Sequence, residues 1–93
     1  MTGSDRGVFA ISVAAAMVSM EVQNLRVYER RGLLRPDRTA GGTRLYSADD
    51  VARLVRIRDL LADGLNLAGI ARVLDLEDEV LKLRRRLARA DSA

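Results

Sequence analysis

The chain contains no cysteine and no histidine in its 93 residues. Without them it has no disulfide, no thiol redox sensor and none of the thiolate or imidazole ligands that bind zinc. The commonest general base is also missing, and the sequence shows no nucleophile–base pair and no phosphate-binding glycine motif. We therefore expect a protein that is not an enzyme and that holds no cofactor and no metal ion.

Long apolar runs are missing as well. No segment reaches the roughly 18 consecutive apolar residues that a transmembrane helix needs. The apolar stretch Val8–Val18 has neither the basic region nor the small-residue cleavage site of a signal peptide. The expected location is therefore the cytoplasm, with no membrane partner.

Aromatic residues make up only 3% of the chain, so its core must consist mainly of Leu, Val, Ile and Ala. A length of 93 residues allows one small domain with a modest core, which a second copy of the chain would help to stabilise. We divide the chain into a flexible N-terminus at residues 1–7, a folded domain at residues 8–76 and a C-terminal helix at residues 77–93.

Arginine is what the sequence has in abundance, since all but Lys82 of its 16 basic residues are arginines. The net charge is +3, and residues 1–46 alone hold seven arginines against four acidic residues. A net charge of this size is weak evidence for a partner, because many solvated surfaces carry it. Its concentration in the first half of the chain is more informative, because the motifs described next lie there.

Apolar periodicity and capping residues predict two helices in this first half. Val8–Ile11 is expected to form a short strand, after which Ser12 caps a helix over Val13–Val18. A second helix should run over about Glu21–Arg31 and end at Gly32, where a positive φ angle is easily adopted. Two helices joined by a short turn form a helix-turn-helix, in which the second helix reads DNA.

The following segment predicts a hairpin and a third helix. Gly41-Gly42 marks a tight reversal between Asp37–Thr39 and Thr43–Tyr46, which is typical of a small β-hairpin, or wing. Ser47 should cap a third helix, and Gly64 should end it.

The last part of the chain is apolar at regular steps. Asn66 can cap a fourth helix, and the apolar residues from Val73 to Ala90 then follow at steps of three and four, as in a coiled-coil seam. The seam can pair with a second copy or fold back on the domain. We expect dimerisation through Val73, Leu76, Val80, Leu83 and Leu87.

The second helix and the hairpin together predict a surface for double-stranded DNA. Guanidinium groups suit both phosphate oxygens and the guanine edge, and Arg38 and Arg44 flank the glycine tip of the hairpin. The alternative for Arg26 is a pair with Glu29 inside the helix, and both tyrosines of this segment can pack in the core instead. The expected DNA-binding residues are Gln23, Asn24, Arg26, Tyr28, Arg30, Arg38, Thr43, Arg44 and Tyr46.

The order of these residues resembles the winged helix-turn-helix domain of the MerR family of bacterial transcription regulators. The segments Pro36–Gly42 and Asn66–Ile70 look most like the heat-shock repressor branch of that family. The resemblance implies a mainly α fold with a small β-hairpin wing and a short C-terminal helix. The matched positions are Leu25, Arg26, Tyr28, Glu29, Arg30, Gly32, Leu33, Leu34, Pro36, Arg38, Gly42, Arg44 and Tyr46.

The same resemblance implies a nucleoid-associated transcriptional repressor of a stress response, which binds an inverted-repeat operator as a homodimer. A chaperone or another protein corepressor would be a further partner. The sequence departs from the family pattern at Asn24, where Thr is usual, and at Glu21-Val22, where Ser-Pro is usual. We therefore expect an operator preference that differs from that of relatives.

Two other functions stay open at this point. The first is an excisionase-type factor for DNA architecture or recombination, which can share the winged-helix scaffold. The second is a protein-binding adaptor that uses the C-terminal leucine seam and does not engage DNA.

Overall fold

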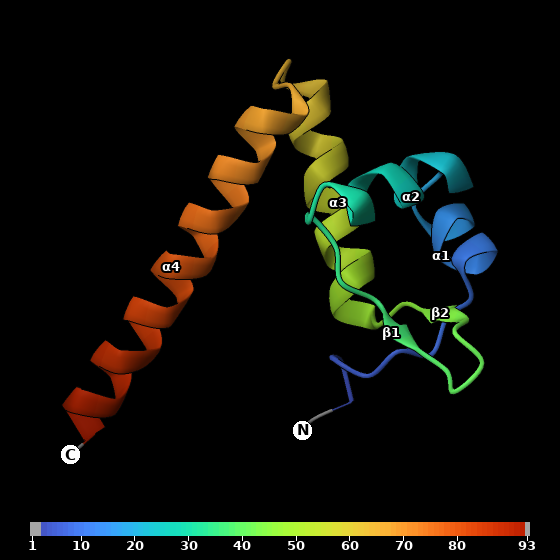
Figure 1. Cartoon of the computed structure of the whole chain (residues 1–93). Helices are drawn as coiled ribbons and strands as arrows, with labels where there is room; N and C mark the ends of the chain where they lie inside the picture. Colours follow the sequence, from blue (N-terminus) through green and yellow to red (C-terminus); the bar gives the residue numbers. More distant parts are fainter. Residues whose placement is uncertain (1–2, 93) are drawn as a thin grey trace. The chain divides into compact units, whose positions relative to one another are not determined.

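The computed structural model describes residues 3–92 and is mainly helical (Figure 1). Its internal contacts divide it into two compact units, one up to Asp59 and one from Leu60 onward. None of the described helices is both long and apolar enough to cross a membrane. The elements follow in the order α1 (Ile11–Met17), α2 (Val22–Arg30), β1 (Asp37–Arg38), β2 (Arg44–Leu45), α3 (Ala48–Ala62) and α4 (Leu67–Ser92).

The first unit begins with the expected helix-turn-helix. α1 buries Ala14 and Ala15, and α2 buries Leu25 and Tyr28. The small side chains of α1 allow α2 to approach it closely, and the two helices are in contact. The turn between them passes through Ser19 in a left-handed conformation, with a φ angle of 57°. α2 thus turns one face to the core and leaves the other face outward.

The start of α1 differs from the prediction. The helix begins at Ile11 without a side-chain cap, and it includes Ser12. Phe9 forms only an isolated antiparallel bridge with Tyr46. The predictions of a strand over Val8–Ile11 and of a cap at Ser12 were therefore wrong. The pairing with Tyr46 holds the chain extended only as far as Phe9, so the helix starts earlier than expected.

The segment before α1 is held by hydrogen bonds to later parts of the same unit. The backbone N–H of Gly7 donates to Oδ2 of Asp37 at 2.9 Å. The backbone N–H of Asp49 donates to the carbonyl of Ser4 at 2.9 Å. Residues 4–7, which were expected to be flexible, are therefore anchored to β1 and to the first turn of α3. Residues 1 and 2 of that expected terminus lie outside the described part of the chain.

Two glycines end α2 and turn the hairpin, as the sequence predicts. Gly32 follows the C-cap residue of α2 with a φ angle of 77°, and Gly42 lies at the hairpin tip with a φ angle of 88°. Both angles are easily adopted only by a residue without a Cβ atom. Strands β1 and β2 pair antiparallel, with Arg38 opposite Arg44. The hairpin therefore presents two arginines side by side.

α3 begins with a reciprocal cap. The backbone N–H of Asp50 donates to Oγ of Ser47 at 2.9 Å, and the backbone N–H of Ser47 donates to Oδ2 of Asp50 at 2.9 Å. This arrangement satisfies a free N–H group at the helix start and confirms Ser47 as the cap. Within the first unit, α3 buries Leu54 and Ile57 completely.

In the second unit, a short turn joins the last residues of α3 to α4. The backbone N–H of Gly64 donates to the carbonyl of Leu61 at 3.0 Å, which ends α3 close to the expected position. Oδ1 of Asn66 accepts a hydrogen bond from the backbone N–H of Gly69 at 2.9 Å. Asn66 is therefore the cap of α4, as predicted.

α4 is a single helix of 26 residues, longer than the short C-terminal helix that the sequence suggested. Nothing after Gly69 stops it, because the segment up to Ser92 contains no further glycine and no proline. Its first turns bury Ile70 and Leu74, whereas the described residues from Asp75 onward are exposed. The boundary expected between residues 76 and 77 thus corresponds to no break in the helix.

Candidate nucleic-acid interface

The outer face of α2 carries the side chains that were expected to read DNA. Leu25 and Tyr28 occupy the inner face of the helix and are buried. An exposed polar face on a short helix fits the major groove, where the base edges present their donors and acceptors. This exposed face includes Gln23, Asn24, Arg26 and Arg30.

Glu29 joins the hairpin to α2. Nη2 of Arg38 donates to Oε2 of Glu29 at 2.8 Å, and Nε of Arg44 donates to Oε1 of the same carboxylate. Nη1 of Arg38 also donates to the carbonyl of Gly42 at 3.0 Å, across the turn of the hairpin. The Glu29 side chain is only 19% exposed. One half-buried carboxylate on α2 therefore bonds one arginine on each strand of the hairpin.

These contacts keep the Glu29 carboxylate ionised. Burial raises the pKa of Glu29, but the hydrogen bonds and positive charges of Arg44 and Arg38 outweigh burial and leave the pKa below its ordinary value of 4.5. The pKa of Arg44 is raised, first of all by its hydrogen bond to Glu29. At neutral pH the cluster thus combines two positive charges with one negative charge, and the positive excess faces the surface.

The two tyrosines of the expected DNA-binding set are buried. Tyr28 is 5% exposed and Tyr46 is fully covered. The Tyr46 hydroxyl makes no hydrogen bond within the described part of the chain. Burial, and then the negative charge of Glu29, raise the pKa of Tyr46. The burial of Tyr46 favours the alternative interpretation, packing in the core, over direct contact with DNA.

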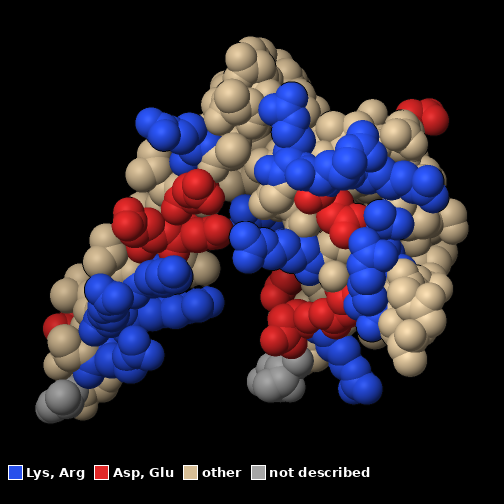
Figure 2. All heavy atoms as spheres, in the orientation of Figure 1, with Lys and Arg blue, Asp and Glu red and all other residues tan. Residues whose placement is uncertain are grey.

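The remaining expected residues lie on the hairpin surface. Arg38 and Thr43 are exposed, and Arg44 is half-buried. Figure 2 shows basic side chains gathered over the region of α2 and the hairpin, with acidic atoms enclosed among them. Arg31 and Arg35, which the sequence analysis left out of the set, are exposed in the same segment. The structure therefore brings the predicted basic residues of α2 and of the hairpin onto adjacent elements.

The sequence analysis missed two arginines of α3 that hold this arrangement together. Nε of Arg53 donates to the carbonyl of Leu33 at 2.6 Å, and Nη1 of Arg58 donates to the carbonyl of Val18 at 2.9 Å. Both carbonyls follow the end of a helix, where backbone acceptors lack a partner inside the helix. The partners are 20 and 40 residues away in the sequence, so no local pattern could have indicated them.

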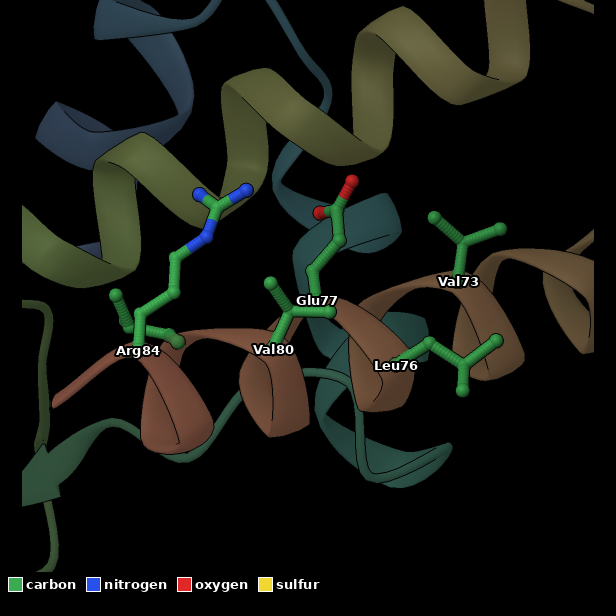
Figure 3. Close-up of a pocket in the computed structure, with 6 residues that line it drawn as sticks. Val73, Leu76, Glu77, Val80 and Arg84 are labelled. Carbon is green, nitrogen blue, oxygen red and sulfur yellow. The ribbon is translucent and has the colours of Figure 1, made fainter. Parts of the chain in front are cut away.

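The predicted dimerisation seam lies along α4 and is largely exposed. Leu83 and Leu87 expose 53% and 64% of their surface. Figure 3 shows a shallow pocket on the same helix, lined by the seam residues Val73, Leu76 and Val80 and by Glu77, Leu81 and Arg84, which lie outside the seam.

Comparison with known proteins agrees with this geometry. Residues 9–77 match the family described as MerR HTH family regulatory protein. The "Putative heat shock protein HspR" of Streptomyces coelicolor is 47% identical over 90 residues, which cover 96% of this chain and 60% of that protein. The "HTH-type transcriptional regulator GlnR" of Bacillus anthracis is 40% identical over 70 residues, which cover 75% of this chain and 54% of that protein.

A solved structure shares the fold. The crystal structure of a MerR-family transcriptional regulator from Bacillus cereus superposes with a TM-score of 0.68 at 28% identity, covering 90% of this chain and 69% of that one. The chain spans 54% to 60% of the length of the two curated relatives above. The predicted fold, mainly α with a hairpin wing and a C-terminal helix, is thereby confirmed. The matched residues include the whole helix-turn-helix and its hairpin, and the chain belongs to the MerR HTH family of regulatory proteins.

Proposed function

We propose that the chain is a sequence-specific DNA-binding transcriptional regulator that acts as a repressor at an inverted-repeat operator. The observation that carries the proposal is the connection of α2 to the hairpin, because Glu29 bonds both Arg38 and Arg44. A reading helix and a cationic wing are thereby held as one surface. α2 would enter the major groove, while the wing would lie against the neighbouring sugar–phosphate backbone.

The proposed contacts divide into two kinds. Gln23 and Asn24 would contact base edges, where each well-formed pair discriminates by roughly 1–3 kcal/mol. Arginines would contact phosphates, so affinity should fall with salt with a log–log slope of roughly −0.9 per phosphate neutralised. Thr43 would add a contact from the hairpin, while Tyr28 and Tyr46 support the surface from the core. The phosphate-binding arginines are Arg26, Arg30, Arg38 and Arg44.

The repressor role and the link to a stress response rest on the relative named as a heat shock protein. That relative is 47% identical and covers 96% of this chain. The matched region is 90 residues long, so it includes nearly all of the chain. Because the chain spans only 60% of that protein, we carry the repressor role and the stress-response role over to it only as proposals.

The exposed seam of α4 supports a homodimer. A contiguous apolar stripe on a monomer is unfavourable in water and commonly marks an interface. Glu77 and Arg84 flank one side of the stripe and Glu79 and Arg86 the other, so charges of one copy can meet opposite charges of the second copy. Such a dimer would place two reading helices on successive turns of the DNA, roughly 34 Å apart.

The test measures binding of the full chain to duplex DNA, selected from a random pool with the wild-type protein, over a series of salt concentrations. Arg44→Ala should weaken binding and reduce the steepness of the salt dependence by roughly 0.9, because one wing–phosphate contact is lost. Arg89→Ala is the matched control, since it removes the same charge from the last turn of α4. Equal binding by the wild type and Arg44→Ala at low salt would contradict the role of the wing.

The genomic sites that match the selected sequences also separate the alternative functions. Inverted repeats in promoter regions support the regulator. Phage-type attachment sites support an excisionase-type factor instead. A wild-type chain that retains no duplex at low salt refutes DNA binding and favours the protein-binding adaptor.

A further inference from the structure

Acidic residues are rare in the segment that forms the proposed DNA surface. Between Asn24 and Tyr46 the sequence has six arginines but only two acids, Glu29 and Asp37. Asp37 accepts a hydrogen bond from the backbone N–H of Gly7 and so belongs to the anchoring of the N-terminal segment. Glu29 is therefore the one acidic residue of this segment that binds arginines of the same segment. Its position among them needs a separate explanation.

The two oxygens of Glu29 serve different strands. Oε2 accepts from Arg38 on β1, while Oε1 accepts from Arg44 on β2. These two arginines lie directly opposite each other in the hairpin, where like charges repel. A carboxylate between them offsets that repulsion and fixes both guanidinium groups relative to α2.

Both arginines keep most of their hydrogen-bonding capacity. A guanidinium group has five N–H donors. Arg44 bonds Glu29 through Nε, while Arg38 bonds Glu29 through Nη2 and Gly42 through Nη1. Further N–H groups on each side chain can therefore face an acceptor outside the chain, and phosphate oxygen is the acceptor that a guanidinium fork matches best.

We propose that Glu29 is a positioning residue that holds the guanidinium groups of Arg38 and Arg44 beside α2, so that the wing contacts the sugar–phosphate backbone while α2 contacts base edges in the major groove. This role rests on the proposed function, since it presumes that duplex DNA is the ligand. Glu29 itself does not touch the DNA. It acts through the two arginines that it holds.

The direction in which DNA affinity changes on removal of the Glu29 charge distinguishes a positioning residue from a carboxylate that only lies near the DNA. A carboxylate beside DNA repels phosphates, so removal of a bystander charge raises affinity, most strongly at low salt. Removal of a positioning carboxylate lowers affinity, although it removes a negative charge. Glu29→Gln keeps the shape of the side chain and tests the two cases against each other. Glu21→Gln is the matched control, because Glu21 precedes the same helix, is exposed and forms no side-chain cap bond.

The experiment uses the full chain and the duplex selected with the wild-type protein. Glu29→Gln should bind about tenfold more weakly and with a shallower salt dependence, and Glu29→Asp should recover part of the loss. Glu21→Gln should bind as tightly as the wild type or more tightly. Circular dichroism of each variant verifies that the helices remain folded at the temperature of the binding measurement.

A double-mutant cycle tests that Glu29 acts through the wing. In an Arg38→Ala, Arg44→Ala background, Glu29→Gln should have no further effect on affinity beyond about twofold, because the groups that it positions are gone. A full tenfold loss in that background would overturn the proposal, as would equal or tighter binding by Glu29→Gln alone. A wild-type chain that binds no duplex overturns the proposed function itself, so the two failures are distinguishable.

Discussion

The α2–hairpin surface and the α4 surface are both rich in charge, yet they are built in opposite ways. On α2 and the hairpin, charged side chains are held by specific bonds, since Glu29 binds Arg38 and Arg44, and the neighbouring Tyr46 is fully buried. Along α4 beyond Leu74, the described side chains are exposed, and apolar residues such as Leu83 lie among the charges. The first surface is held by bonds within its own unit, whereas the second leaves apolar side chains exposed.

The difference shows how much a chain can organise within itself. An arginine pair on a hairpin of two-residue strands would not stay fixed without a counter-charge from another element, because long side chains lose much rotamer entropy when ordered. The first unit supplies that counter-charge from α2. In α4, acidic residues between Asp75 and Glu79 and basic residues between Lys82 and Arg89 follow each other as separate blocks. We therefore propose phosphate groups as the ligand of the first surface and a second copy of the chain as the partner of the other.

The largest expected effect is on the free energy of unfolding, when a leucine of α2 is replaced by alanine and the same change is made in α4 for comparison. Leu25→Ala removes a fully buried side chain from α2 and should lower the free energy of unfolding by about 2–5 kcal/mol. Leu81→Ala, at an exposed position of α4 outside the seam, should change it by less than about 0.5 kcal/mol. Urea denaturation followed by circular dichroism measures both values. Similar losses for the two variants would mean that α4 is packed and not exposed.

A charge placed in the seam should break the dimer without unfolding the chain. Leu83→Asp puts a carboxylate among apolar side chains of two copies and should weaken self-association on the order of 100-fold. Leu81→Asp is a matched control, because Leu81 is exposed to nearly the same extent, 48% against 53%, but lies outside the seam. Sedimentation velocity over a concentration series compares them. A dimer that survives Leu83→Asp, or that Leu81→Asp disrupts equally, would contradict the seam assignment.

The smallest effect concerns pH and the Glu29 cluster. Because the pKa of Glu29 is lowered in the folded chain, its contribution to stability is complete above the ordinary value of 4.5 and is lost as the pH falls through the folded-state pKa. The wild type should therefore be more stable than Glu29→Gln at neutral pH, by about 1 kcal/mol or less, since such pairs are partly exposed. Thermal melts between neutral and acidic pH should show this difference shrinking below pH 4.5. A difference that stays constant or grows in acid would argue against the ion pairs.

Most of the fold could be predicted because its signals are local. Gly32 and Gly42 lie where the backbone requires positive φ angles, and Ser47 and Asn66 bond N–H groups three residues ahead. Prediction failed at Ser12, where a helix start was set by strand pairing with a residue far along the chain. Cap preferences are weak and yield to such tertiary contacts.

The candidate site likewise contains some residues whose exposure or burial could be predicted from local sequence and others for which it could not. The exposure of Gln23, Arg26 and Arg30 follows from the spacing of Leu25 and Tyr28, because helical periodicity places them away from the buried face. Asn24 lies four residues before the buried Tyr28, so its exposure was not evident from periodicity. The burial of Tyr46 does not follow from spacing. The burial of Tyr46 depends on the chain segment before α1, where the backbone of Val8 and Phe9 forms hydrogen bonds with the backbone of Tyr46.

The sequence by itself determined the helix-turn-helix, the glycine-tipped hairpin, the caps at Ser47 and Asn66 and the family, because each depends on residues close together in the chain. Only the tertiary structure decided that Glu29 holds both wing arginines, that Arg53 and Arg58 bond carbonyls beyond α2 and α1, and that Tyr46 belongs to the core. These partners are 9 to 40 residues apart, and side chains at such separations meet only after the helices have packed.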